Sequence, residues 1–211
     1  MRWIVRTGVA ELSVRRSRFV ARALFLPDPP RWESALAAVR ETVPGASHYV
    51  YAWRWDPGHE GADDAGEPAG TGGHPILDLL RRRELERAMV VVARYFGGIK
   101  LGRPGLLRAY REAAAAALDA APTAEAERVL PLAVGMAYAL YHAWLAELEQ
   151  GGCRRDQVDF GPTVTWRGVV RARDLDRLEA WAAAQGGAVD LRAGLPEWGV
   201  LAAPETGAPP S

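Results

Sequence analysis

A lone lysine among glycines is the part of this sequence with the clearest capacity for chemistry. Lys100 is the only lysine in the 211 residues, whose other Lys+Arg positions are all arginine. It lies in a short turn with Gly97, Gly98 and Gly102. Glycines let a phosphate approach backbone N–H groups closely, and an ammonium group adds a compact positive charge. The turn therefore predicts a site for a phosphate or another anion.

Arginines flank this turn on both sides. We expect the anion or nucleic-acid site to consist of Arg94, Gly97, Gly98, Lys100, Gly102, Arg103 and Arg108. A second interpretation stays open, in which the arginines form a solvated helix face and the glycines only make tight turns. The sequence has neither a Walker motif nor the glycine pattern that opens a dinucleotide-binding helix, which argues against the usual nucleotide sites.

A weaker candidate for chemistry is an acid–base pair formed by His48 and Glu67. Such a pair would serve an enzyme that acts on a small phosphorylated or peptide-like substrate. The histidines and carboxylates follow no standard ligand spacing, so we expect no metal site and no cofactor. Cys153 is the only cysteine and lies outside the glycine-rich segments, which argues against a thiol nucleophile.

The hydrophobic pattern predicts the elements that hold the turn. The run from Met89 to Ala93 is apolar throughout, which is typical of a strand buried on both faces. Pro104 suits the first turn of a helix that follows, in which we expect Leu107 to be buried. Residues 56–73 read as a long polar loop, and residues 122–127 as a linker.

A strand over residues 48–55 precedes this region, and its alternation places four aromatic side chains on one face. They are Tyr49, Tyr51, Trp53 and Trp55. In register, these rings would either stack RNA bases or pack beneath a helix, and the sequence leaves this choice open.

The organisation of the whole chain follows from composition and pattern. With 49% apolar residues the chain can form packed cores, and no apolar run approaches the roughly 20 residues that span a bilayer. The pattern beyond residue 125 reads strand–helix–strand–strand–helix–strand. We therefore expect a cytoplasmic α+β protein without a membrane partner. Its parts would be a domain over residues 1–125, a domain over 126–203 and a disordered tail over 204–211.

Two motifs resemble those of one known family. The segment Gly66–Gly73, GEPAGTGG, and the segment Arg94–Gly102, RYFGGIKLG, are similar in sequence and order to signatures of the IMPACT/YigZ family. Ser17-Arg18-Phe19 and Ala46-Ser47-His48 also match. The chain departs from the family pattern at Ala65, where an aspartate is usual, and at Val50, where a cysteine is usual. Both departures weaken the case for an aspartate-pair metal site or a thiol mechanism.

The resemblance implies a fold and three hypotheses of function. The first domain would be a βαβ sandwich like domain IV of elongation factor G, followed by a ferredoxin-like domain, as in the bacterial YigZ branch. Eukaryotic members act in translational control. We therefore expect a translation-associated protein that contacts structured RNA or the ribosome. The alternatives are the enzyme that uses His48 and Glu67, and a regulator that binds a translation-control protein without nucleic acid. The regulator would need an exposed apolar face at Tyr49 and Trp53 or on the C-terminal sheet.

Overall fold

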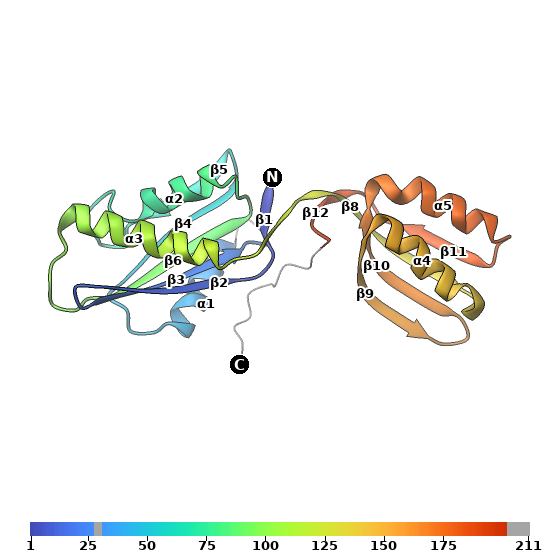
Figure 1. The fold of residues 1–211 in the computed structure, drawn as a ribbon, viewed down its shortest axis with the longest axis horizontal. Coiled ribbons are helices and arrows are strands. Elements are labelled where there is room, and N and C mark those ends of the chain that lie inside the picture. The colour runs from blue at the N-terminus through green and yellow to red at the C-terminus, as the bar shows by residue number, and fades with distance from the viewer. Residues whose placement is uncertain (28–30, 202–211) are drawn as a thin grey trace. The chain divides into compact units, whose positions relative to one another are not determined.

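The computed structural model describes residues 1–27 and 31–201, which divide into two compact units (Figure 1). Unit 1 extends to Glu125, and unit 2 begins at Ala126. Helices and antiparallel sheets occur in both, so the α+β class expected from the sequence is confirmed. The tail over residues 204–211 lies outside the described residues. Among the described residues, no helix combines the length and the apolar composition that spanning a bilayer requires.

Unit 1 is built on a five-stranded antiparallel sheet with the order β2-β3-β6-β4-β5. The strands are β2 (Gly8–Val14), β3 (Ser17–Phe25), β4 (His48–Asp56), β5 (His59–Asp63) and β6 (Ala88–Tyr95). The predicted buried strand is β6, which lies in the centre of the sheet and is buried from Ala88 to Arg94. A separate pair joins β1 (Arg2–Ile4) to β7 (Thr123–Glu125).

Helices cover both faces of this sheet. Alternate residues of β6, among them Met89 and Val91, pack with α1 (Trp32–Thr42) on one face. The other face holds α2 (Gly73–Arg82) and α3 (Gly102–Asp119), whose Tyr110 meets Phe19 of β3 edge to face. The glycine-rich turn around Lys100 therefore connects the end of β6 to α3, which packs on the same sheet.

The aromatic row of β4 lies on the α1 face. Its four side chains are half-buried and pack against the cluster formed with α1. Trp32 stacks on Tyr51 and Trp53, with ring centroids 5.3 and 6.1 Å apart. The structure thus uses the row as packing beneath a helix, and it presents neither an open base-stacking platform nor the exposed apolar face that the regulator hypothesis needed.

Three expectations for unit 1 were wrong. The region 56–73 contains β5, because Asp56 Oδ1 accepts the backbone N–H groups of Gly58 and His59 and turns the chain into a hairpin. The supposed linker contains β7. In α3, Leu107 is 38% exposed, and the buried position is the neighbouring Leu106.

Unit 2 has the predicted order of elements. The strands β8 (Glu127–Met136), β9 (Cys153–Phe160), β10 (Val164–Arg171) and β11 (Val189–Ala193) form an antiparallel sheet in the order β11-β8-β10-β9. A further strand, β12 (Glu197–Gly199), also pairs with β8. The helices α4 (Tyr141–Gly151) and α5 (Leu175–Ala184) supply Trp144, Leu148 and Leu178 to a core shared with Trp166 of β10.

Candidate functional site

A row of side chains crosses one end of the unit 1 sheet on the face that α2 and α3 cover. Arg94 of β6 pairs in register with Phe19 of β3 and with His48 of β4. Directly opposed residues in antiparallel strands have their side chains on the same face, so these three side chains are neighbours. The central buried strand therefore carries a cation at its second-last position.

Glu67 reaches this row from the loop between β5 and α2. Its Oε1 accepts hydrogen bonds from Arg94 Nη1 at 2.6 Å and from the Tyr110 hydroxyl at 2.8 Å. The Glu67 and Arg94 side chains are only 4% and 6% exposed, so they form a buried ion pair. Burial, reinforced by the Glu67 carboxylate, raises the pKa of the Tyr110 phenol well above its ordinary value. The phenol therefore stays protonated and serves as a donor.

His48 stands beside this pair. Its Nδ1 lies 2.9 Å from the Ala65 carbonyl oxygen, and its Nε2 lies 4.0 Å from Glu67 Oε1. A carbonyl can only accept, so Nδ1 carries a proton and Nε2 faces the carboxylate. The structure therefore brings the two predicted acid–base residues together. Because Glu67 is already bound by Arg94 and Tyr110, its contacts are those of an anchor, and catalysis by the pair stays a prediction.

The loop that carries Glu67 is fixed by Asp64. The Asp64 carboxylate accepts the backbone N–H groups of Gly70, Gly72 and Gly73 at distances between 2.7 and 2.9 Å. Burial disfavours the charged carboxylate, but these three N–H groups outweigh burial and hold the pKa of Asp64 below its usual value. The charged form of Asp64 therefore stabilises the loop and the start of α2.

This shift predicts an acid sensitivity. The pKa of Asp64 is lower in the folded than in the unfolded chain. Its contribution to stability is therefore complete above the unfolded value of about 3.9 and is lost as the pH falls through the folded value. We expect Asp64→Asn to lose less stability than wild type between pH 7 and pH 3, measured as urea midpoints. Asp78→Asn, on the exposed side of α2, is the control. Equal losses in wild type and Asp64→Asn would contradict this role.

The predicted turn, which holds Gly97, Gly98, Lys100 and Gly102, lies at the surface at the same end of the sheet. The Gly97 N–H donates to Ser17 Oγ at 3.3 Å. A Cβ on Gly97 would lie 2.7 Å from the Arg16 Cβ and would overlap the Arg16 carbonyl. The connection from β6 to α3 therefore lies against the turn between β2 and β3, as Figure 1 shows. This contact brings Arg15 and Arg16 to the candidate site.

The predicted site residues divide between this edge and the interior. Gly98, Lys100, Gly102, Arg103 and Arg108 are exposed, and Gly97 is half-buried. Arg94 is buried against Glu67, so it does not belong to the exposed surface with the others.

We call Arg15, Arg16, Lys100 and Arg103 the basic rim. Arg103 Nη2 donates to the Ala69 carbonyl at 2.7 Å, which ties the start of α3 to the Glu67 loop. Arg15, Arg16 and Lys100 are exposed and form no ion pair with any described residue. The two arginines of the β2–β3 turn were not among the predicted site residues. Their adjacency between two strand-like segments was the available signal, but only the fold places them beside Gly97.

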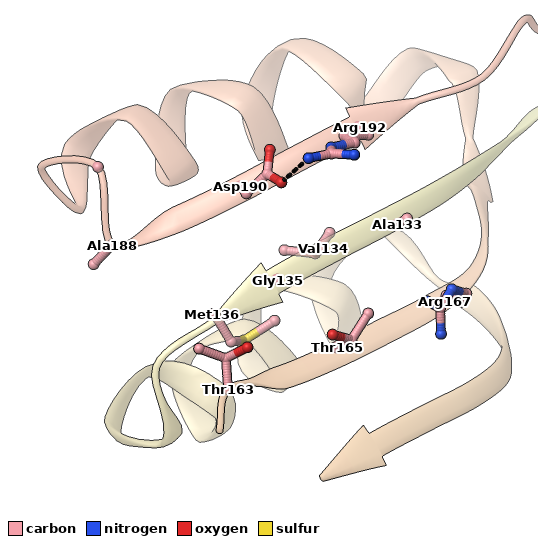
Figure 2. Close-up of a pocket in the computed structure, with 11 residues that line it drawn as sticks. Ala133, Val134, Gly135, Met136, Thr163, Thr165, Arg167, Ala188, Asp190 and Arg192 are labelled. Atoms are coloured by element: carbon pink, nitrogen blue, oxygen red, sulfur yellow. Dashed lines mark ion pairs between the residues drawn. The ribbon is translucent and has the colours of Figure 1, made fainter. Parts of the chain in front are cut away.

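A hollow lies in unit 2, on the side of the sheet away from the α4 and α5 core. Figure 2 shows β8 in the middle of this hollow, with Gly135 between Asp190 and Thr165 and Ala133 between Arg192 and Arg167. The arginines that line this hollow are paired, Arg192 with Asp190 at 2.7 Å and Arg167 with Asp159 at 2.5 Å. The hollow offers no uncompensated charge, and its threonine, arginine and aspartate side chains do not make the apolar face expected of a protein-binding regulator.

Comparisons with known proteins agree with the two motifs. Residues 15–118 match the Impact N-terminal domain. An IMPACT family member from Thermus thermophilus is 46% identical over 111 residues, which cover 53% of this chain and 60% of the relative. YigZ of Escherichia coli is 36% identical over 101 residues, 46% of this chain and 50% of the relative. The matched part of the chain thus spans between half and three fifths of these relatives.

Two longer similarities extend into unit 2. The IMPACT family member YvyE of Bacillus subtilis is 27% identical over 180 residues, covering 82% of this chain and 81% of the relative. A crystal structure of a hypothetical protein superposes with a TM-score of 0.60 at 26% identity, covering 90% of this chain and 95% of that one. The motifs of unit 1, the matched domain and these relatives together show that the chain belongs to the IMPACT family.

Proposed function

We propose that unit 1 binds the phosphate backbone of RNA at the basic rim, as a translation-associated protein of the cytoplasm. The observation that carries the proposal is the contact of Gly97 with Arg16, which joins the β2–β3 turn to the turn that holds Lys100. Three cations without ion-pair partners among the described residues therefore lie on the two turns that meet at this contact. Phosphate groups supply most of the affinity in such interfaces, and Lys and Arg are the residues that bind them.

The backbone of the β2–β3 turn supports the same proposal. Arg15 and Arg16 have φ angles of +43° and +67°, as a two-residue hairpin turn requires. Asn-Gly is the preferred sequence for this turn, and a residue with a Cβ costs about 1–2 kcal/mol in the left-handed region. The chain carries this cost twice at the point where it exposes two positive charges. Strain of this kind accumulates at functional sites.

A triple variant tests the proposal. We expect Arg15→Asn, Arg16→Gly and Lys100→Ala together to weaken binding of a fluorescently labelled RNA hairpin about tenfold at 0.1 M salt. The slope of log affinity against log salt should become shallower by about 2, since each lost phosphate contact removes roughly 0.7–0.9. Anisotropy titrations from 50 to 300 mM salt measure both quantities. The Asn-Gly turn relieves strain, so weaker binding cannot be attributed to a weakened fold.

The control removes three exposed arginines elsewhere, Arg82, Arg155 and Arg173, by alanine substitution. This variant has the same net charge as the triple variant, so it should keep the wild-type slope if the basic rim is the contact. Binding by wild type that does not depend on salt, or equal slopes in the two variants, would contradict the proposal. If wild type binds no RNA and captures only proteins after nuclease treatment, the regulator hypothesis replaces it.

A further inference from the structure

Phe96 is a large apolar side chain at the surface, one residue before the Gly97 that contacts Arg16 of the basic rim. It follows β6 directly, and 48% of its surface is exposed. The Arg94 guanidinium carbon lies 5.3 Å from the centre of its ring, within the range of a cation–π contact. Single exposed apolar residues are common, so the exposure of Phe96 alone does not indicate a binding site.

The contacts around Phe96 hold it in a defined position. The Phe96 N–H donates to Ser47 Oγ at 3.4 Å, and the N–H of the next residue, Gly97, donates to Ser17 Oγ at 3.3 Å. The arginine beside the ring is itself held by the buried Glu67. These hydrogen bonds hold the backbone at Phe96 and Gly97 just beyond the end of the central strand. The ring contacts Arg94 and remains half exposed to solvent.

An exposed aromatic ring beside unpaired cations has the chemistry of a single-strand RNA site. Unpaired bases stack on aromatic side chains, while adjacent cations hold the phosphates. Bases inside a continuous duplex are stacked on one another and offer no free face to a protein ring. Phe96 would therefore add affinity only for an RNA whose bases are unpaired.

We infer that Phe96 is a stacking platform for an unpaired base, so that the ligand of the basic rim is single-stranded or looped RNA rather than continuous duplex. This inference rests on the proposed function and specifies its substrate class. The base lies on the open part of the Phe96 ring, and the neighbouring phosphates contact Lys100 and the arginines of the rim. Stacking requires only a π-face, so the site does not select one base over another.

The test compares a labelled single strand with a blunt duplex of the same length, both by anisotropy. We expect Phe96→Leu to weaken single-strand binding about tenfold and to leave duplex binding unchanged. Phe96→Tyr keeps the ring and should bind like wild type. With 2-aminopurine in the single strand, wild type should quench its fluorescence and Phe96→Leu should not. These two substitutions differ in ring chemistry at an exposed position, so neither should alter the fold.

The outcomes separate the two proposals. If Phe96→Leu binds the single strand as wild type does, or if Phe96→Tyr loses as much as Phe96→Leu, the stacking platform is wrong. The triple variant of the basic rim would still report on phosphate binding in that case. If neither RNA binds in a salt-dependent way, the proposed function itself fails. Loss of binding to a protein partner on Phe96→Leu, without any RNA effect, would assign the ring to an apolar socket of that partner.

Discussion

Replacing Glu67 with alanine is expected to lower the free energy of unfolding of unit 1 by about 3–5 kcal/mol. The Arg94 side chain is only 6% exposed, so the substitution leaves its guanidinium group buried without a counter-charge. It also removes the acceptor of the Tyr110 hydroxyl, whose raised pKa keeps it a donor. Breaking one half of a buried pair costs far more than the pair contributes, because the remaining charge cannot reach water.

Hydrogen exchange of peptides that cover β6 measures this loss within the intact chain and reports on unit 1 alone. Asp78→Ala, which breaks the exposed ion pair with Arg81, is the matched control and should cost less than about 1 kcal/mol. Glu67→Leu combined with Arg94→Met should recover much of the lost stability, because it removes both charges and keeps the volume. A loss in Glu67→Ala as small as that of the control would mean that water reaches Arg94 and that the pair is not a buried anchor.

Much of the fold could be predicted from the sequence, because apolar pattern decides central elements. The run in β6 is buried along its length, and its continuity allowed only a strand covered on both faces. The family resemblance, which the matched Impact N-terminal domain confirms, rested on motifs in the loops around that strand. Polar edge strands were not predictable in the same way. The residues of β5 carry no apolar alternation, and they form a strand because Asp56 closes the hairpin onto β4.

The sequence around each residue of the candidate site could not predict which charged side chains pair with one another or share a surface. Proximity in sequence suggested that Arg94 lies with Lys100 on one surface. Alternation along β6 instead turns Arg94 toward the α3 face, where a glutamate from a loop 27 residues away neutralises it. Conversely, Arg15 and Arg16 are more than 80 residues from Lys100 in the chain, and only the register of β3 against β6 brings their turn to Gly97. The partners of a charged residue and its neighbours on the surface depend on the tertiary structure, whereas a buried strand can be predicted from its local sequence pattern.

The contact at Gly97 also leads to the second large prediction. Gly97→Ala should cost about 2–3 kcal/mol and weaken RNA binding at the same time. The cost does not come from backbone strain, because Gly97 is not among the residues with positive φ. It comes from the Arg16 backbone, which the new methyl group would overlap, and a backbone carbonyl cannot rotate away as a flexible side chain can. The β2–β3 turn must therefore move away from the turn that holds Lys100.

Gly98→Ala is the matched control for this substitution. Gly98 has a φ of +85° and open space around its position, so an alanine there meets strain of about 1–2 kcal/mol but no neighbour. If separation of the two turns is what matters, Gly97→Ala should shift the salt slope toward that of the triple variant, whereas Gly98→Ala should keep the wild-type slope despite its lower stability. Urea unfolding and salt titrations on the same samples distinguish these effects. Equal slopes in the two alanine variants would show that binding does not depend on holding Arg15 and Arg16 beside Lys100, and the basic rim would then not act as one surface.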